Sequence, residues 1–316
     1  MIGKKMLADA MCIMHDLVSP HTANIIRYVQ NNTFNEYIHT ASIMKKALFY
    51  LVIFVAVQAF AYVAVLAVGK MAGWDGFGVE GGGTGGRGQM SANGLVFASL
   101  LGCIILLGIF LKTGWCKWRF SFLLAKGSMA ATYGWTLAAV VGSILPSAWL
   151  QELTGMETEG SMEGLVEMLK SGWSLLAVCL LVPLTEEVVF RGGILGTLMN
   201  EMRHRWTAIL VSAVMFGAAH FNLAQMPHAV LMGVFLGWLC VRTGNVGVGV
   251  WAHVVNNSMI YAIISLMPGG KEMTLSQLMK GNETAFYIAI FLSAILSVFS
   301  VRKLNNIMRT AEQPTN

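Results

Sequence analysis

The chain has 316 residues, of which 56% are hydrophobic and only 12% are charged, and its mean hydropathy is +0.64. Because a soluble globular domain carries roughly 25% charged residues, this composition excludes a water-soluble domain, a disordered chain and a coiled coil, and it indicates a membrane protein. The net charge of +5 does not indicate nucleic-acid binding, because basic residues in membrane proteins usually set the orientation. We therefore expect the lipid bilayer, and no nucleic acid, as a partner.

The N-terminal residues 1–43 have an amphipathic, weakly helical pattern. We expect them to form a cytoplasmic or interfacial tail on the inner membrane surface. Asp9, His15 and Asp16 interrupt the apolar run that a signal peptide needs, so we expect no cleaved signal peptide. Further along, the Gly-rich segment 72–93 predicts a flexible loop outside the membrane.

Eight stretches are apolar enough to cross the hydrocarbon core, which takes about 20 residues. They lie at residues 47–69, 94–111, 127–150, 171–199, 206–222, 227–241, 245–266 and 285–301. The stretches 206–222 and 227–241 are short, and we expect them to form a tight helical hairpin. The sequence thus predicts an all-α fold, a polytopic helical bundle of about eight transmembrane helices.

This pattern divides the chain into four parts. After the tail at 1–43 come the N-terminal transmembrane helices and loops at 44–170, a core at 171–301 and a C-terminal cytoplasmic tail at 302–316.

Lysine and arginine residues are distributed unevenly between the two sides of these stretches. If the N-terminus is cytoplasmic, the outer loops hold only Lys70, Arg87, Lys170, Lys271 and Lys280, and the inner flanks hold more than twice as many basic residues. This asymmetry follows the positive-inside rule and predicts that both termini are cytoplasmic.

Five cysteines are scattered along the chain without a C-x-x-C pair. They are Cys12, Cys103, Cys116, Cys179 and Cys240. Most lie in apolar runs, and we interpret them as small buried hydrophobic residues and not as a metal or redox framework.

Ionisable residues within a membrane span cost on the order of 2.5–3.5 kcal/mol each, so they are functional-site candidates. The first cluster holds Glu186, Glu187 and Arg191. Glu187 and Arg191 are four residues apart and can form an ion pair on one helix face, whereas Glu186 is turned about 100° away. Pro183, one turn earlier, can open the backbone near Glu186. The alternative is a buried salt-bridge network that only fixes helix packing.

A second cluster ends in His220, four residues after Phe216, with Gly217 and two alanines between them. Small residues allow a neighbouring helix to approach closely, which would bring His220 near other polar groups. A lone buried histidine is more often a packing residue than a catalyst. His228, near the end of a span and without such neighbours, is interpreted as structural.

The third cluster contains His253 and Asn257, which project from the same helix face. Both side chains can donate hydrogen bonds and could stabilise an oxyanion, although the same pair could also serve helix packing. Asn256 points elsewhere. Together with Glu186 and His220, which can position a water and take its proton, these groups suffice for acyl transfer without a serine or cysteine nucleophile.

The ordered motifs E-E-x3-R, F-x3-H and H-x3-N, each on its own apolar stretch, resemble the CPBP family of intramembrane proteases, also called the Abi or CAAX-protease family. The best-known members are the type II CAAX prenyl endopeptidases, and the resemblance covers roughly residues 171–266. It implies a helical core with a catalytic cavity inside the bilayer and no cofactor. The roles that it implies are general base for Glu186, its partner for His220, oxyanion hole for His253 and Asn257, and structural or substrate-orienting positions for Glu187, Arg191 and Phe216.

The expected substrate is a membrane-anchored peptide or protein, in a bacterial plasma membrane. Members of the family process prenylated C-termini, take part in bacteriocin maturation or self-immunity, or act as scaffolds, so the resemblance leaves the substrate open.

Three alternatives remain open at this stage. Glu186, His220 and His253 could form a two-histidine, one-carboxylate zinc site of a metalloprotease, although the helical H-E-x-x-H signature is absent. The same buried residues could form a proton or ion relay in a transporter, although no inverted repeat is visible. The third alternative is a non-catalytic scaffold or immunity protein.

Overall fold

The computed structural model describes residues 20–73, 79–80, 89–119, 129–153, 163–266 and 282–312. The chain divides into two compact units, residues 1–46 and 47–316. This division falls within the first helix, α2 (Pro20–Ala72). Residues 1–19 of the tail expected at 1–43 lie outside the described residues, and the rest of that tail belongs to α2. Its location on the membrane surface stays a prediction.

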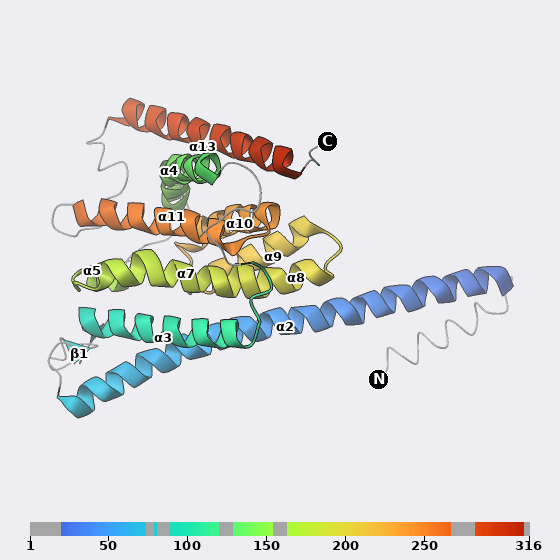
Figure 1. The fold of residues 1–316 in the computed structure, drawn as a ribbon, viewed down its shortest axis with the longest axis horizontal. Coiled ribbons are helices and arrows are strands. Elements are labelled where there is room, and N and C mark those ends of the chain that lie inside the picture. The colour runs from blue at the N-terminus through green and yellow to red at the C-terminus, as the bar shows by residue number, and fades with distance from the viewer. Residues whose placement is uncertain are drawn as a thin grey trace. The chain divides into compact units, whose positions relative to one another are not determined.

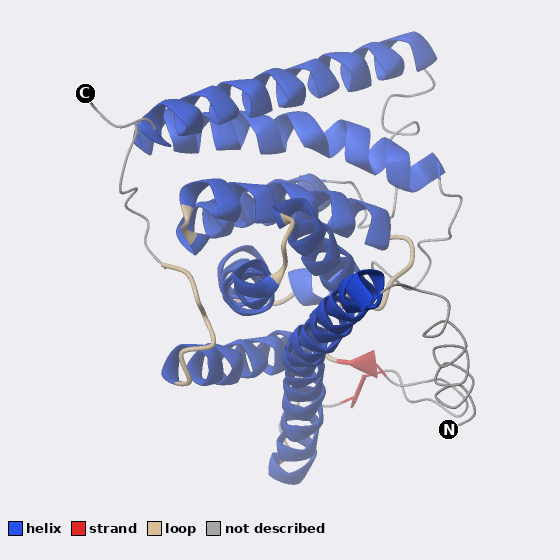
Figure 2. Ribbon diagram, turned by 90° about the vertical axis from the view of Figure 1, so that its right-hand side faces the viewer, coloured by secondary structure: helices blue, strands red, loops and turns tan. Residues whose placement is uncertain are grey.

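A short β hairpin and a series of helices follow α2. In the hairpin, β1 (Val79–Glu80) pairs antiparallel with β2 (Gln89–Met90) and is drawn in red in Figure 2. It lies within the loop expected at 72–93, of which residues 74–78 and 81–88 are outside the described part of the chain. The helices are α3 (Ala92–Lys112), α4 (Met129–Leu153), α5 (Glu163–Leu169), α6 (Ser174–Leu176), η1 (Ala177–Leu181), α7 (Val182–Glu186), η2 (Glu187–Leu195), α8 (Gly196–Glu201), α9 (Arg205–Ala218), α10 (Met226–Thr243), α11 (Val246–Leu266) and α13 (Glu283–Glu312).

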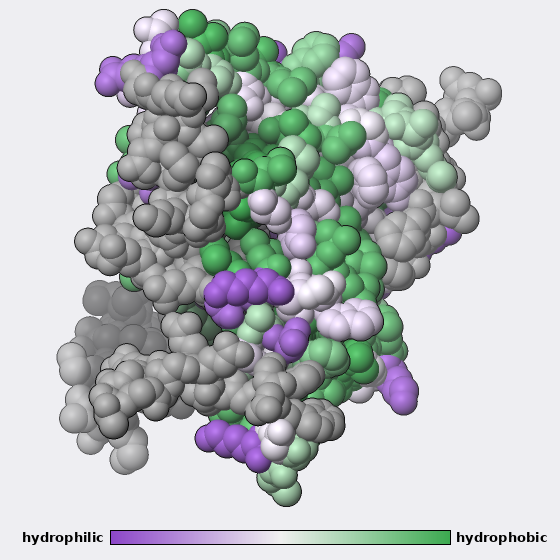
Figure 3. All heavy atoms as spheres, turned by 90° about the vertical axis from the view of Figure 1, so that its left-hand side faces the viewer, coloured by the Kyte–Doolittle hydropathy of each residue, from purple (hydrophilic) through white to green (hydrophobic). Residues whose placement is uncertain are grey.

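The structure confirms an all-α polytopic membrane protein. Six helical segments among the described residues are long and apolar enough to cross a membrane. They are Ala41–Ala72, Ala92–Lys112, Met129–Leu153, Met226–Thr243, Val246–Leu266 and Glu283–Arg309. In each, less than half of the most apolar stretch is buried within the protein, which leaves apolar side chains for contact with lipid. In the view of Figure 3, the described surface is largely hydrophobic, with separate hydrophilic patches.

The two other expected spans are also helical but differ from a simple transmembrane helix. The stretch at 171–199 is a continuous run from α6 to α8 that includes the π-helical segments η1 and η2. The stretch at 206–222 contains α9, an apolar helix of 14 residues, which is shorter than a full span. The total of eight therefore stays a prediction.

The C-terminal helix is longer than expected, because α13 continues to Glu312 through most of the tail expected at 302–316. Residues 313–316 lie outside the described part. The cytoplasmic location of both termini and the bacterial plasma membrane stay predictions.

Helices from α3 onward pack in successive layers. α13 lies against α4, α4 contacts α10 and α11, and α11 packs on the run from η1 to η2, which in turn contacts α3 (Figure 1). Small residues allow close packing between them: a Cβ added to Gly142 on α4 would lie 2.6 Å from the backbone nitrogen of Ser297 on α13. The run from η1 to η2 is therefore enclosed between α11 and α3, and it carries Glu186, Glu187 and Arg191.

Candidate active site

The helix that carries Glu186 and Glu187 has two wide, π-helical turns around the short α7. Pro183 lies at the start of α7 and has no backbone N–H. In a regular α-helix its ring would also clash with the carbonyl four residues earlier. The N–H of Val182 reaches back five residues to the carbonyl of Ala177, which is the π-helical pattern that the proline favours here. Such turns are frequent at functional sites.

Glu187 and Arg191 form the ion pair that their spacing predicts. Arg191 Nη1 lies 2.9 Å from Glu187 Oε1, and the two side chains are 1% and 0% exposed. Arg191 Nη2 also donates to the carbonyl of Gly233 at 3.3 Å, and its guanidinium carbon lies 4.3 Å from the centre of the Phe216 ring. A buried charge must be paired to be tolerated, and these contacts compensate both charges.

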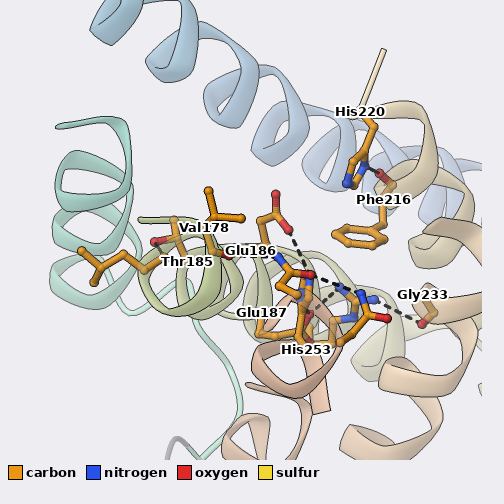
Figure 4. Close-up of polar contacts among 12 residues, drawn as sticks. Val178, Thr185, Glu186, Glu187, Phe216, His220, Gly233 and His253 are labelled. Atoms are coloured by element: carbon orange, nitrogen blue, oxygen red, sulfur yellow. Dashed lines mark hydrogen bonds and ion pairs between the residues drawn. The ribbon is translucent and has the colours of Figure 1, made fainter. Parts of the chain in front are cut away.

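His253 connects the two adjacent glutamates. Its Nδ1 lies 2.9 Å from Oε1 of Glu187. Because a carboxylate accepts hydrogen bonds, Nδ1 carries a proton and donates it to this contact. Its Nε2 faces Oε2 of Glu186 at 3.6 Å. The side chain of Glu186 is 14% exposed, whereas that of Glu187 is fully buried. Glu187 therefore orients the imidazole ring, and the second ring nitrogen faces the more accessible carboxylate (Figure 4).

His220 has a backbone carbonyl as its hydrogen-bond partner. Its Nδ1 lies 2.9 Å from the carbonyl oxygen of Phe216, one turn earlier at the end of α9. Within the described residues it forms no ion pair with Glu186, and in Figure 4 the dashed line from Glu186 leads to His253. The Phe216 ring meets both imidazoles edge-on, with centroid distances of 4.9 Å to His220 and 5.7 Å to His253. The cooperation of Glu186 with His220 stays a prediction.

Asn257 lies one turn after His253 on α11, as its spacing predicts. Its Nδ2 donates to the carbonyl of Val178 at 3.1 Å, and its Oδ1 accepts from Nδ2 of Asn256 at 3.2 Å. Asn256 is only 3% exposed, and its Oδ1 has no hydrogen-bond partner within the described part of the chain. Sequence reasoning set Asn256 aside, but it belongs to the same polar cluster.

One further residue at the site, Gly249, was not identified from the sequence. His228, interpreted as structural, lies on α10, which packs against α9 and α11. A Cβ on Gly249 would lie 2.9 Å from Oε2 of Glu187. Gly249 precedes His253 by one helical turn, and this spacing could have indicated from the sequence that the two residues lie on the same helix face.

The zinc alternative requires Glu186, His220 and His253 to converge on one point. In the part of the chain that the structure describes, no three His, Cys, Asp or Glu side chains are grouped so that they could hold a metal ion. That the protein needs no cofactor stays a prediction.

The fold and the site together define a polytopic helical membrane protein with a buried carboxylate and imidazole cluster. Residues 169–259, which include all three motifs, match the family model described as "Type II CAAX prenyl endopeptidase Rce1-like". This match confirms the resemblance over that segment.

A Bacillus subtilis (strain 168) protein named "Putative membrane peptidase YdiL" is 30% identical over 115 residues, which are 36% of this chain and 46% of the relative. The similarity thus spans about half the length of that curated relative. No solved structure matches the chain significantly.

Proposed function

We propose that the protein is an intramembrane endopeptidase that hydrolyses peptide bonds of membrane-anchored proteins or peptides by means of a water activated by Glu186. The observation that carries the proposal is the 3.6 Å approach of the Glu186 carboxylate to Nε2 of His253. That carboxylate is accessible, and the neighbouring guanidinium of Arg191 is engaged by Glu187 instead.

The different burial and partners of the two glutamates support this assignment. Glu187 is fully buried, ion-paired and bonded to His253, and it positions the imidazole. Glu186 is 14% exposed and faces Nε2 of His253 at 3.6 Å. Neighbouring carboxylates whose environments differ in this way commonly have different catalytic roles.

In the proposed reaction, Glu186 takes a proton from a water molecule while the water oxygen forms a bond to the scissile carbonyl carbon. The carbonyl electron pair moves onto its oxygen, and this oxyanion accepts hydrogen bonds from Asn257 and from His253 in its protonated form. When the tetrahedral intermediate collapses, the C–N bond breaks and Glu186 returns the proton to the leaving nitrogen. Asn257 uses one of its two Nδ2 hydrogens for Val178, so the second is available.

His220 is proposed to hold the same water from the other side of Phe216. Its Nδ1 donates to a backbone carbonyl, so the neutral ring presents the Nε2 lone pair as an acceptor. A water donates two hydrogens and can bridge Glu186 and His220.

The substrate is proposed to be held by the membrane, because the catalytic residues lie on apolar helices. Two classes are candidates: a prenylated C-terminus of the CAAX type, or an unprenylated peptide such as a bacteriocin precursor. The family match to CAAX prenyl endopeptidases supports the first. The second follows from the expectation of a bacterial plasma membrane.

The test is a cleavage assay with purified protein in detergent on membrane-anchored peptides with and without a prenyl group. Wild type, Glu186→Gln and Glu167→Gln are compared, with and without a zinc chelator. Glu167→Gln makes the same chemical change at a glutamate paired with Lys170 on α5 and should retain activity.

Cleavage that is lost in Glu186→Gln and retained with the chelator supports the proposal. Loss with the chelator would support the zinc alternative and refute the metal-free scheme. No cleavage of either peptide class by the wild type would favour a scaffold or immunity protein. Unchanged cleavage by Glu186→Gln would overturn the role of that carboxylate.

A further inference from the structure

The wide turn before Glu186 leaves one backbone carbonyl without its helical partner. In an α-helix, the carbonyl of Val178 would accept from the N–H of Val182, but that N–H is directed to Ala177. In a π-helix it would accept from residue 183, but Pro183 has no N–H. Neither backbone donor that a helix could offer to Val178 is therefore available.

Asn257 supplies the missing hydrogen bond. Its Nδ2 donates to the Val178 carbonyl at 3.1 Å, although the two residues lie on different helices and far apart in the sequence. Two residues one turn apart on α11 thereby hold the helix that carries the glutamates, His253 through Glu187 and Asn257 through Val178. An unsatisfied carbonyl in an apolar environment is costly, so this bond stabilises the wide turn.

We infer that Asn257 is a positioning residue, which holds the π-helical turn at Val178 and thereby sets the direction in which Glu186 points. This role rests on the proposed function and is additional to any contact of Asn257 with the oxyanion.

The direction of Glu186 depends on this turn because a π-helical turn contains one more residue than an α-helical turn. Each residue in a helix rotates the side-chain direction by about 100°. If the turn changed its width after the Val178 carbonyl lost its donor, Glu186 would rotate away from Nε2 of His253 or the whole segment would have to shift. The 3.6 Å contact between Glu186 and His253 is therefore coupled to the bond between Asn257 and Val178.

A double-mutant cycle tests this coupling. Asn257→Ala removes the donor, and Pro183→Ala adds a backbone N–H that can reach the same carbonyl. We expect Asn257→Ala to lower kcat with little change in KM in the wild-type background. The fold-decrease in kcat caused by Asn257→Ala should be about 5 to 160 times larger in the wild-type background than in the Pro183→Ala background. This ratio corresponds to the loss of one buried hydrogen bond.

Equal factors in the two backgrounds would overturn the inference and would leave Asn257 as an oxyanion donor alone. The matched control is Ser300→Ala, which removes a buried hydroxyl bonded to the Leu296 carbonyl on α13. Its effect should be the same with or without Pro183→Ala.

The same coupling can be measured without an activity assay. The midpoint of thermal unfolding in detergent is compared for wild type, Asn257→Ala, Pro183→Ala and the double variant. A midpoint drop from Asn257→Ala that Pro183→Ala does not reduce would also overturn the inference. A wild type that cleaves no peptide would refute the proposed function, while the cycle of midpoints would still report whether Asn257 stabilises the turn.

Discussion

Removal of the Arg191 guanidinium should destabilise the protein severely, and the structure gives the reason. Arg191→Met leaves the fully buried carboxylate of Glu187 without its counter-ion, and Oε2 of that carboxylate already has no hydrogen-bond partner within the described residues. Breaking a buried ion pair by removing one partner costs about 3–5 kcal/mol. The lost contact between Arg191 and the Phe216 ring adds about 1–2 kcal/mol.

The double variant Glu187→Gln with Arg191→Met separates these two contributions. It removes the uncompensated charge, while the glutamine carbonyl can still accept from Nδ1 of His253. We therefore expect it to recover most of the ion-pair cost and to remain destabilised by only about 1–2 kcal/mol, the aromatic contribution.

The assay is equilibrium unfolding in detergent, followed by the change in helical circular dichroism. Arg302→Met is the matched control, because it makes the same substitution at an exposed position on α13 and should change the free energy of unfolding by less than about 0.5 kcal/mol. If the double variant is as unstable as Arg191→Met alone, the unpaired carboxylate is not the cause and the reasoning is wrong.

Three further predictions concern packing, backbone conformation and thiol reactivity. Gly249→Ala places a methyl group 2.8 Å from Cys240 Sγ and 2.9 Å from Glu187 Oε2, and it should lower the free energy of unfolding by about 1–3 kcal/mol. Gly108→Ala, with open space around the new Cβ, should have no such effect in the same unfolding assay. Gly244→Ala should cost about 1 kcal/mol, because Gly244 ends α10 with a φ of +61°; an unchanged midpoint would contradict this. Burial raises the pKa of the Cys116 thiol, so at pH 8 less of it is thiolate and iodoacetamide should modify it more slowly than free cysteine; an equal rate would contradict the prediction.

Local spacing predicted much of the site. The ion pair of Glu187 with Arg191 follows from four-residue spacing, which still brings the two side chains together although both lie in the π-helical η2. The shared face of His253 and Asn257 follows from the same rule within α11. These predictions hold because they concern a single helix, where the backbone alone fixes which side chains are neighbours.

Contacts between helices were not predictable in the same way. Glu186 faces Nε2 of His253 at 3.6 Å, a contact between two helices that no spacing indicated. His228 lies on α10, which packs against both α9 and α11. No spacing rule connects residues on different helices, so their distances depend on how the helices pack.

Sequence periodicity was least informative around Glu186 and Glu187, because the π-helical segments η1 and η2 do not keep the α-helical repeat. Pro183 was recognised as a place where the backbone can open, but the sequence alone does not tell how the freed carbonyl is satisfied. Asn257, 79 residues away along the chain, satisfies it. A polar side chain that seemed available for substrate is thus also required by the backbone.

Adjacent glutamates would repel each other in an apolar setting if both were charged without compensation. Arg191 and His253 together engage the carboxylate of Glu187 and reduce that repulsion, while Glu186 faces Nε2 of His253 at 3.6 Å. Gly249 on α11 has no side chain, and this leaves room for the carboxylate of Glu187. The same contacts that make Glu187 tolerable inside the protein therefore leave Glu186 as the carboxylate for the proposed activation of water, so a structural ion pair and a proposed catalytic base can occupy consecutive positions.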